Sequence, residues 1–310
     1  MVILLIIGAA IVVSGNDATS SATQLDKVVV ADAKTTHHLN LYVAKEKGIF
    51  EKNGLDVEII KVEDLSAARD AVVAGKADVF WSCPTVAISA IAGGAPIKII
   101  SQVKKPCTSV LVVSQDSPIK ELTDLKGKRI AGISPSCEAV ISITKAAKEA
   151  NAEFVLEKLA GGPALAALEA GQVDGAILEE PQVSIAELKG YKVLFRGISD
   201  DIPCRTINAR TSFISADPDV LKRFVESVDE ANELILADPT ASDIVDIAVE
   251  YTGAPKDAII HGNDRLLFRI LLDEKGLESL ADDLIDLGIT NKNPGKDLYA
   301  DEFKGITWGK

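Results

Sequence analysis

The chain has 310 residues, of which 47% are hydrophobic and 25% charged, and this is the composition of a folded globular protein of about two domains. Its formal charge of -13 at pH 7 provides no basic face for a phosphate backbone, which excludes nucleic acid as a partner. The 22 glycines and 12 prolines are near average usage and exclude collagen-like and low-complexity classes.

The chain begins with an apolar run. Val2 to Val13 carries no charge, and a polar stretch through Gln24 follows. This length is typical of a signal-peptide core and falls short of the ~20 residues of a spanning helix, although no Lys or Arg precedes it and no clear cleavage site follows. The alternative is a buried N-terminal strand. We expect residues 1–25 to be a signal peptide or N-terminal membrane anchor with a polar linker, and the body from Asp26 onward to be extracytoplasmic.

Short β-branched runs alternate with helical patterns along the rest of the chain, which predicts an α/β fold with largely parallel sheets. The predicted strands are Lys27–Ala33, Val57–Val62, Asp78–Trp81, Ile97–Val103, Ser109–Val113, Arg129–Ile133, Gly175–Leu178, Lys192–Phe195 and Ile207–Ile214. Asp217 and Pro218 predict the cap and first residue of a long helix. Beyond it we expect mainly helices and no further strand.

One pattern occurs twice. Ala74-Gly75-Lys76-Ala77-Asp78 and Ala170-Gly171-Gln172-Val173-Asp174 each close a predicted helix and open a strand, ninety-six residues apart. In both, the glycine stands where a helix end needs a positive φ. Such junctions are common in α/β proteins, but the repeat also fits two similar lobes. Ligands of open α/β sheets bind beyond the carboxyl ends of the strands, so two facing lobes imply a cleft between them.

Four blocks resemble the substrate-binding proteins of ABC importers, in the nitrate/sulfonate/taurine and thiamine-pyrimidine-precursor (NMT1/THI5-like) family. They are His38 to Glu58, Gly75-Lys76-Ala77-Asp78, Asp124 to Ile130, and Leu168 to Asp174 reaching Glu180-Pro181. The resemblance spans roughly residues 28–239. No single block is specific, but four in the same order are.

The resemblance implies a periplasmic-binding-protein-like (type II) clamshell, in which each lobe is a small mixed sheet flanked by helices and the chain crosses twice between lobes. Residues 26–111 and 206–310 would form one lobe and residues 112–205 the other. The implied function is to capture a small solute, nitrate/sulfonate/taurine-like or pyrimidine-like, by hinge closure and deliver it to a membrane permease and its ATPase subunit. No cofactor, metal or covalent chemistry is implied, and the membrane would be met only through the N-terminal segment or the permease.

Four loops at predicted strand ends are the candidate ligand-binding segments. Their candidate residues are Thr36, His37, His38, Trp81, Ser82, Cys83, Thr85, Ser134, Ser136, Cys137, Glu179 and Glu180. Trp81 could stack on a planar solute, or it belongs to the core of a buried strand. Ser134 or Ser136 could bring free helix N–H groups to an anion, or serve only as a cap.

The glutamates at 179 and 180 are adjacent, so at most one of them points into the cleft from an extended segment. A carboxylate there favours a cationic or amino-bearing solute. Together with an anion at the helix start, this charge pattern fits a zwitterionic sulfonate such as taurine, whereas Trp81 fits a planar heterocycle equally well.

The four cysteines, at 83, 107, 137 and 204, have no spacing typical of a zinc ribbon. Disulfides or inert thiols are one interpretation and a soft-metal or cofactor site the other. A bond between Cys83 and Cys137 would cross the cleft and hinder closure. We therefore expect Cys107–Cys204 if a disulfide forms.

Two other functions compete with solute transport. The pyrimidine-precursor synthases that resemble these binders carry a Lys-x-x-x-His pair, and Ser82 and Val86 stand at the corresponding positions here. The sequence also has no Gly-x-Ser-x-Gly, His-Glu-x-x-His or Gly-x-x-x-x-Gly-Lys motif. We therefore expect a binding protein and not an enzyme. A ligand-sensing domain is the other alternative.

Overall fold

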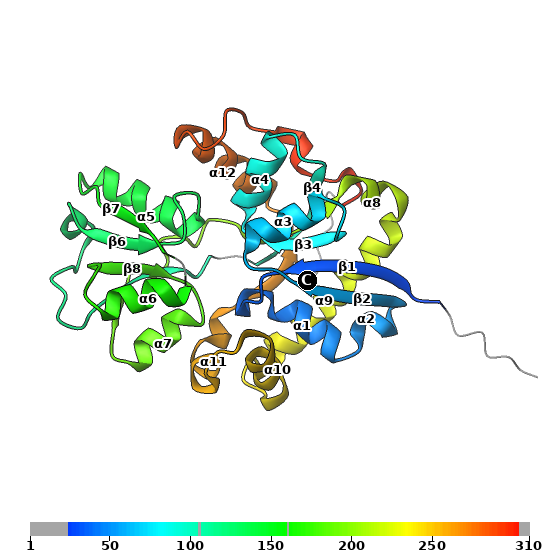
Figure 1. Ribbon diagram of the computed structural model, residues 1–310, viewed down its shortest axis with the longest axis horizontal. Helices are drawn as coiled ribbons and strands as arrows, with labels where there is room; N and C mark the ends of the chain where they lie inside the picture. Colours follow the sequence, from blue (N-terminus) through cyan, green and yellow to red (C-terminus); the bar gives the residue numbers. More distant parts are fainter. Residues whose placement is uncertain (1–23, 105–106, 160, 304–310) are drawn as a thin grey trace, which may run out of the picture.

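The strands form two separate mixed sheets in the computed structural model, which describes residues 24–104, 107–159 and 161–303 (Figure 1). The first sheet has the order β11-β4-β10-β3-β1-β2 and the second the order β7-β6-β8-β5-β9. The strands of the first sheet are β1 (Asp26–Asp32), β2 (Leu55–Lys61), β3 (Val79–Ser82), β4 (Ile97–Lys104), β10 (Cys204–Arg210) and β11 (Phe268–Leu271). The strands of the second are β5 (Val110–Val113), β6 (Arg129–Gly132), β7 (Val155–Lys158), β8 (Gly175–Leu178) and β9 (Lys192–Leu194). We call the elements built on these two sheets lobe 1 and lobe 2.

Helices flank both sheets. Those that precede β9 are α1 (Leu39–Glu46), α2 (Ile49–Lys52), α3 (Leu65–Val73), α4 (Pro84–Ala92), α5 (Glu138–Glu149), α6 (Gly161–Glu169) and α7 (Gln182–Leu188). Those of the C-terminal part, which pack on lobe 1, are α8 (Thr211–Ala216), α9 (Pro218–Ala237), α10 (Ser242–Thr252), α11 (Lys256–Gly262) and α12 (Glu274–Asp286). Short 3-10 helices lie at Thr36–His38, Leu122–Leu125, Asn263–Arg265, Gly295–Leu298 and Asp301–Phe303. The predicted α/β clamshell architecture is confirmed.

The expectation of largely parallel sheets holds only around β1 and β6. Strands β1/β2, β1/β3, β6/β7 and β6/β8 are parallel, whereas β10, β11 and β5 run antiparallel to their neighbours. The chain passes between the sheets after β4 and again after β9, and each return enters its sheet in the opposite direction. The antiparallel strands β5 and β10 are therefore the first strands after each crossover, whereas β11 follows helices of lobe 1.

Strands β7 and β11 were not predicted from the sequence, and strand β10 was predicted too long. Strand β7 carries little apolar signal, because it lies at the sheet edge and its Val155 is 53% exposed. Strand β11 lies within the tail that we expected to be helical. The strand predicted at Ile207–Ile214 ends at Arg210, where α8 begins. By contrast, α9 begins at Pro218 as predicted, although the Asp217 side chain makes no capping hydrogen bond.

The repeated helix-Gly-strand pattern builds the same junction in both lobes. Gly75 has a φ of 74° and Gly171 a φ of 66°, as the helix ends require. In each lobe the following aspartate then accepts a backbone N–H from the neighbouring strand. Asp78 accepts from Val29 at 3.0 Å, and Asp174 accepts from Arg129 at 2.8 Å. The strand orders β2-β1-β3 and β7-β6-β8 correspond as well.

Each sheet has an apolar core on both faces. In β3 the side chains of Val79 and Trp81 join the core shared with α9, and Phe80 joins the opposite core, as the period of two in a strand requires. The lobes also touch beside the crossovers, where Ile141 of α5 packs in the core that includes Leu277 and Leu280 of α12. The segment predicted as a signal peptide or anchor lies outside the described residues. Within them, no helix combines the length and apolarity needed to cross a membrane.

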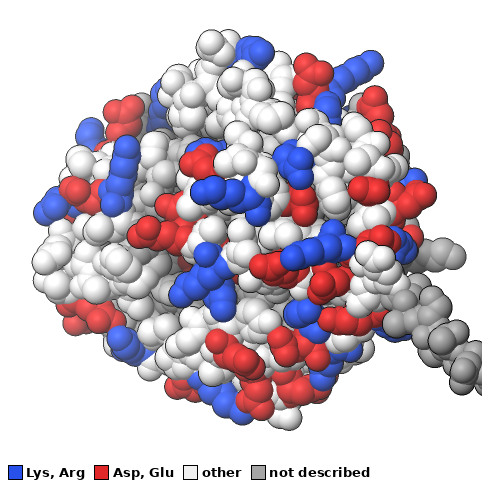
Figure 2. Space-filling model, turned by 45° about the vertical axis from the view of Figure 1, so that its right-hand side comes forward, with Lys and Arg blue, Asp and Glu red and all other residues white. Residues whose placement is uncertain are grey.

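Charge is distributed rather than gathered. Figure 2 shows acidic and basic side chains interspersed over one face of the molecule. Many of them pair at the surface, as Lys27 does with Glu58 at 2.8 Å. That face therefore offers no continuous basic surface to a polyanion.

Candidate functional site

A cavity of about 660 Å³ lies between the lobes, and we call it the cleft. The lobe 1 residues that line it are 33–35, 63–66, 83, 85, 86 and 252–255, and the lobe 2 residues are 133, 134, 136, 137, 161, 179, 181, 182 and 185. Arg205, near the start of β10 where the chain returns to lobe 1, completes the lining. Its volume is in the range of pockets for organic small molecules.

The two loops that follow the repeated strands meet at one buried cation. Cys83 follows β3 and Glu179 follows β8, and they stand at equivalent places in the two repeats, ninety-six residues apart. Arg205 donates through Nη1 to the Sγ of Cys83 at 2.7 Å and through Nη2 to Oε2 of Glu179 at 2.8 Å. One guanidinium therefore ties the strand ends of the two lobes together at the cleft.

Arg205 is only 2% exposed and has a φ of 59°. A left-handed backbone at a residue with a side chain costs of the order of 1–3 kcal/mol and persists where the surroundings enforce it. Sequence reasoning placed a crossover at this residue but no function. The signal available was an arginine among the apolar and small residues that open a predicted strand.

A second carboxyl group lies next to this arginine. Glu138, the first residue of α5, is 1% exposed, and burial raises its pKa to about 7. The nearby Cys107 also raises this pKa, whereas Arg205 and hydrogen bonds from its own backbone N–H and from Cys83 lower it. We call Cys83, Glu138, Glu179 and Arg205 the Arg205 cluster. It holds one cation between two carboxyl groups, one from the start of α5 and one from the loop after β8.

Half of the residues predicted at the site do line the cleft. They are Cys83, Thr85, Ser134, Ser136, Cys137 and Glu179. The hydroxyl groups of Ser134 and Ser136 bond to each other at 2.9 Å, and neither caps α5 by a side-chain hydrogen bond. Thr85 is 1% exposed, and its Oγ1 has no hydrogen-bond partner among the described residues.

Trp81 and Ser82 do not line the cleft, so their expected contact with a solute needs correction. Trp81 is fully buried in the core of lobe 1, with its ring edge-on to Phe224 at 5.7 Å between centroids. Ser82 is also fully buried, and its hydroxyl accepts a hydrogen bond from the side chain of Asn208 at 3.1 Å. Both side chains stabilise the sheet, because β3 is a central strand covered on both faces.

The predicted segment Thr36 to His38 lies beneath the cleft lining. His38 is fully buried, and its Nδ1 is 2.6 Å from Oδ1 of Asp32. The other carboxylate oxygen of Asp32, Oδ2, accepts a hydrogen bond from the hydroxyl of Tyr42 at 2.7 Å. Burial lowers the pKa of His38, although Asp32 opposes this. His37 is buried with its Nε2 3.9 Å from Glu179, so it supports the Arg205 cluster from lobe 1.

Glu180 joins the lobes and does not line the cleft. Its Oε1 pairs with Arg265 of lobe 1 at 2.8 Å, its Oε2 accepts from Ser184 at 2.7 Å, and its carbonyl accepts from Thr36 Oγ1 of lobe 1 at 3.0 Å. Glu187 pairs with the same arginine at 2.7 Å. The two adjacent glutamates thus divide their roles: Glu179 faces the cleft and Glu180 holds lobe 2 against the segment after α11.

None of the four cysteines forms a disulfide, so the Cys107–Cys204 bond that we expected if a disulfide forms is absent. Cys107, Cys137 and Cys204 pack in one core of lobe 2. Burial raises the pKa of Cys83 and of Cys137 well above the usual range, which keeps both in the neutral thiol form. Within the described part of the chain, no three His, Cys, Asp or Glu side chains gather as they would to hold a metal ion.

We expect a thiol reagent to titrate four thiols in the unfolded protein whether or not a reductant is added, because none of the four cysteines forms a disulfide. In the native protein at pH 8, we expect Cys83 and Cys137 to react at least tenfold more slowly than in the unfolded chain, because the attacking species is the thiolate. Ellman's assay with and without guanidinium measures both. Fewer than four thiols in the unreduced, unfolded chain would contradict the free-thiol assignment.

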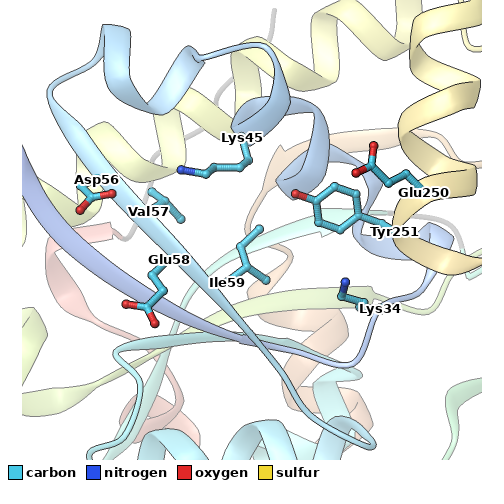
Figure 3. A pocket seen from close by; sticks show the side chains of 8 residues that line it. All are labelled: Lys34, Lys45, Asp56, Val57, Glu58, Ile59, Glu250 and Tyr251. Carbon is cyan, nitrogen blue, oxygen red and sulfur yellow. The ribbon is translucent and has the colours of Figure 1, made fainter.

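A second hollow, of about 600 Å³, lies on the outer side of lobe 1 beside β2 (Figure 3). Its aromatic side chain, Tyr251, is already engaged: the hydroxyl donates to Glu46 at 2.6 Å, the ring stacks on Tyr42, and Lys34 Nζ lies 4.9 Å from the ring centroid. Only lobe 1 lines this hollow. The cleft, which both lobes line, is therefore the candidate site.

Comparison with known proteins agrees with this geometry. The family model described as NMT1/THI5 like matches residues 35–242. The crystal structure of the periplasmic aliphatic sulphonate binding protein SsuA from Escherichia coli superposes with a TM-score of 0.79 over 89% of this chain and 92% of that one. At 19% identity this likeness concerns the fold.

Curated relatives carry different kinds of name, of which two examples follow. A 4-amino-5-hydroxymethyl-2-methylpyrimidine phosphate synthase from Aspergillus parasiticus is 24% identical over 225 residues, which are 67% of this chain and 66% of that protein. A putative binding protein from Brucella abortus is 28% identical over 222 residues, which are 69% of this chain and 67% of that one. The alignments thus span about two thirds of the length of these relatives.

Proposed function

The chain belongs to the NMT1/THI5-like family, and on this premise we propose that it is the extracytoplasmic solute-binding component of an ABC importer. It captures a small solute between its lobes and delivers it to a membrane permease that works with an ATPase subunit. The observation that carries the proposal is the cleft itself. It is lined from both lobes, and the arginine at its base bonds to both of the strand ends that meet there.

The connections between the lobes suit a hinge. Two crossovers join the sheets, and the remaining contacts are ion pairs and small apolar patches, such as Lys145 to Asp283 at 2.6 Å. Contacts of this kind open and close without unfolding either sheet. Solute release unchanged requires no reacting group, and a thiol kept neutral by burial is not an activated nucleophile.

A thermal-shift screen tests the proposal. A solute that binds the folded protein raises its stability by RT ln(1 + [L]/Kd), about 2.7 kcal/mol at a hundredfold excess over Kd. We expect one class of small solute to raise the melting temperature and to be recovered unchanged by mass spectrometry. Small-angle scattering is then expected to show a smaller radius of gyration on binding. Recovery of the hit as a chemically altered product would overturn the proposal.

Closure depends on a close approach at Gly262, the last residue of α11. A Cβ built there lies 2.3 Å from Ser184 Oγ and 2.6 Å from Glu180 Oε2, both in lobe 2. We therefore expect Gly262→Ala to push α7 away from α11, destabilising the protein by about 1–3 kcal/mol. The radius of gyration of the solute-bound protein should rise toward that of the free protein, and affinity should fall at least tenfold.

Gly162→Ala is the matched control. Gly162 lies in α6 with an ordinary φ and no atom within 4 Å of a built Cβ, so the added methyl group is expected to leave affinity unchanged. An equal effect of both substitutions on the scattering curve would contradict the role of Gly262.

The synthase-like enzyme is the second candidate, because several aligned relatives carry that name. The residues here fit it poorly. At the positions of the synthase Lys-x-x-x-His pair, Ser82 is buried and bonded to Asn208, and Val86 is an apolar side chain at the cleft. We expect no change in the absorption spectrum of pyridoxal phosphate when the protein is added. A Schiff-base band would favour the enzyme.

A further inference from the structure

The charged side chains that line the cleft have an excess of carboxylates. The cations are Lys34 and Arg205, and the carboxylates are Glu63, Asp64 and Glu179. Glu138 lies buried next to this lining and adds a further carboxyl group. An anionic solute would therefore enter a site whose fixed charge repels it.

Both cations of the lining already contact groups of the protein. Arg205 is 2% exposed and directs both of its terminal nitrogens to Cys83 and Glu179. Lys34 holds its ammonium group 4.9 Å from the ring centroid of Tyr251, a residue of the outer hollow (Figure 3). The terminal nitrogens of Arg205 are thus paired within the protein, whereas the Lys34 ammonium group makes a cation–π contact with the ring of Tyr251.

The starts of α3, α5 and α7 carry the chain's own carboxylates, whereas α6, which begins at Gly161 in the lining, has no acidic residue in its first turn. Asp64 accepts from the N–H of Ala67 at the start of α3, Glu180 accepts from the N–H of Ser184 in α7, and Glu138 is itself the first residue of α5. Helix α4 begins with Pro84, which has no N–H to offer. Apart from that of α6, the positive ends of these helix dipoles are therefore neutralised or incomplete before any solute arrives.

Hydrogen-bond acceptors remain unused. The hydroxyl of Thr85 lines the cleft at 1% exposure, without a partner among the described residues. Glu179 is 29% exposed and uses Oε2 for Arg205, and no hydrogen bond of the described residues uses its Oε1. No aromatic ring is among the lining side chains that the structure describes, so the site lacks the cage typical of quaternary ammonium ligands.

We propose that the solute of this cleft is an organic cation whose charged group is a primary ammonium or an amidinium, donating its N–H groups to Glu179 and Thr85. This inference rests on the proposed function and names its substrate class. A volume of about 660 Å³ exceeds the needs of an inorganic ion and leaves room for an organic body.

Isothermal titration calorimetry with three kinds of probe tests the inference. Putrescine and agmatine represent the proposed class, ethanolamine and choline form a matched pair that differs in the N–H groups, and butanesulfonate and nitrate are the anions. We expect the amines to bind, ethanolamine to bind more tightly than choline, and the anions not to bind.

Glu179→Gln is expected to weaken amine binding about 10- to 100-fold, because it removes a charge-assisted hydrogen bond. Glu157→Gln makes the same change in net charge at an exposed site in β7 outside the cleft, and it should alter affinity less than twofold. Equal effects of the two variants would overturn the assignment of Glu179.

Protons exchanged with the buffer on binding give a further measurement, which would not change if Glu138 had only a structural role. Glu138 faces Cys83, Cys107 and Arg205, and its pKa of about 7 makes it sensitive to an added charge. A bound cation lowers this pKa and releases protons near pH 7, so the apparent binding enthalpy should vary with the ionisation enthalpy of the buffer. A bound anion would cause proton uptake.

The outcomes distinguish a failure of the organic-cation assignment from a failure of the solute-binding function. Binding of butanesulfonate or nitrate without binding of the amines would overturn the organic-cation assignment and leave the solute-binding function standing. Failure of every amine would also overturn the inference, and the thermal-shift screen would then test the function independently.

Discussion

Replacing Arg205 by methionine is expected to destabilise the protein by about 3–5 kcal/mol, the cost typical of removing one partner from a buried ion pair. The substitution keeps the apolar stem but leaves Glu179 without its cation and Cys83 without its hydrogen-bond donor. Glu138 also loses the nearby positive charge that lowers its pKa. Urea unfolding at pH 7 measures the difference in free energy.

A double variant and an exposed pair serve as controls. Adding Glu179→Gln to Arg205→Met removes the uncompensated charge and should recover part of the lost stability. Lys27→Met breaks a pair of similar length, 2.8 Å, but both partners are more than half exposed, so we expect little change in the unfolding midpoint. A loss below about 1 kcal/mol for Arg205→Met would show that the cluster does not hold the lobes as described.

Glu138→Gln is expected to change the free energy of unfolding in a pH-dependent way. The difference in this free energy between the variant and the wild-type protein should be about 3 kcal/mol more favourable to the variant at pH 8 than at pH 4. The folded-state pKa of about 7 exceeds the ordinary value of 4.5, so folding favours the protonated form. The stability contributed by this proton is fully present below pH 4.5 and is lost as pH rises toward and through 7. Glutamine cannot ionise, so the variant does not lose stability through this group as pH rises.

The measurement is urea unfolding of both proteins at several pH values between 4 and 8. Burial also lowers the pKa of His38 below its ordinary value of about 6.5. The stability that neutral His38 contributes is therefore lost as pH falls below about 6.5, which is the opposite of the pH dependence caused by Glu138. The difference between the two proteins cancels this shared contribution. A difference that stays constant from pH 4 to 8 would contradict a buried, titrating Glu138.

Local patterns in the sequence predicted much of the framework. The glycines at 75 and 171 end helices because their positive φ is a local requirement, and the residues of Pro218–Ala237 form a helix whose apolar stripe is evident at a spacing of three and four. Strand β7 escaped prediction because an exposed edge strand has no apolar alternation to detect.

The candidate site was predicted only in part, because a side chain near the end of a strand either packs in the core of its lobe or lines the cleft, and local sequence does not decide between the two. Cys83, Thr85 and Glu179 reached the cleft, whereas Trp81 and Ser82 were drawn into the core by cover on both faces of β3. Glu180 instead pairs with Arg265, a residue eighty-five positions away in the sequence. The one local sign of Arg205 was its position among the apolar and small residues that open a predicted strand, and its partners come from distant segments.

The amino-acid sequence by itself determined that two similar α/β lobes form and that acidic and polar side chains end their strands, because helix ends, turns and strand faces depend on neighbouring residues. Only the tertiary structure decided which of these side chains share one cleft and what charge remains there. Arg205, Glu138 and Glu179 come from three separate segments, and their electrostatic state depends on burial and distance, which arise when the lobes pack together.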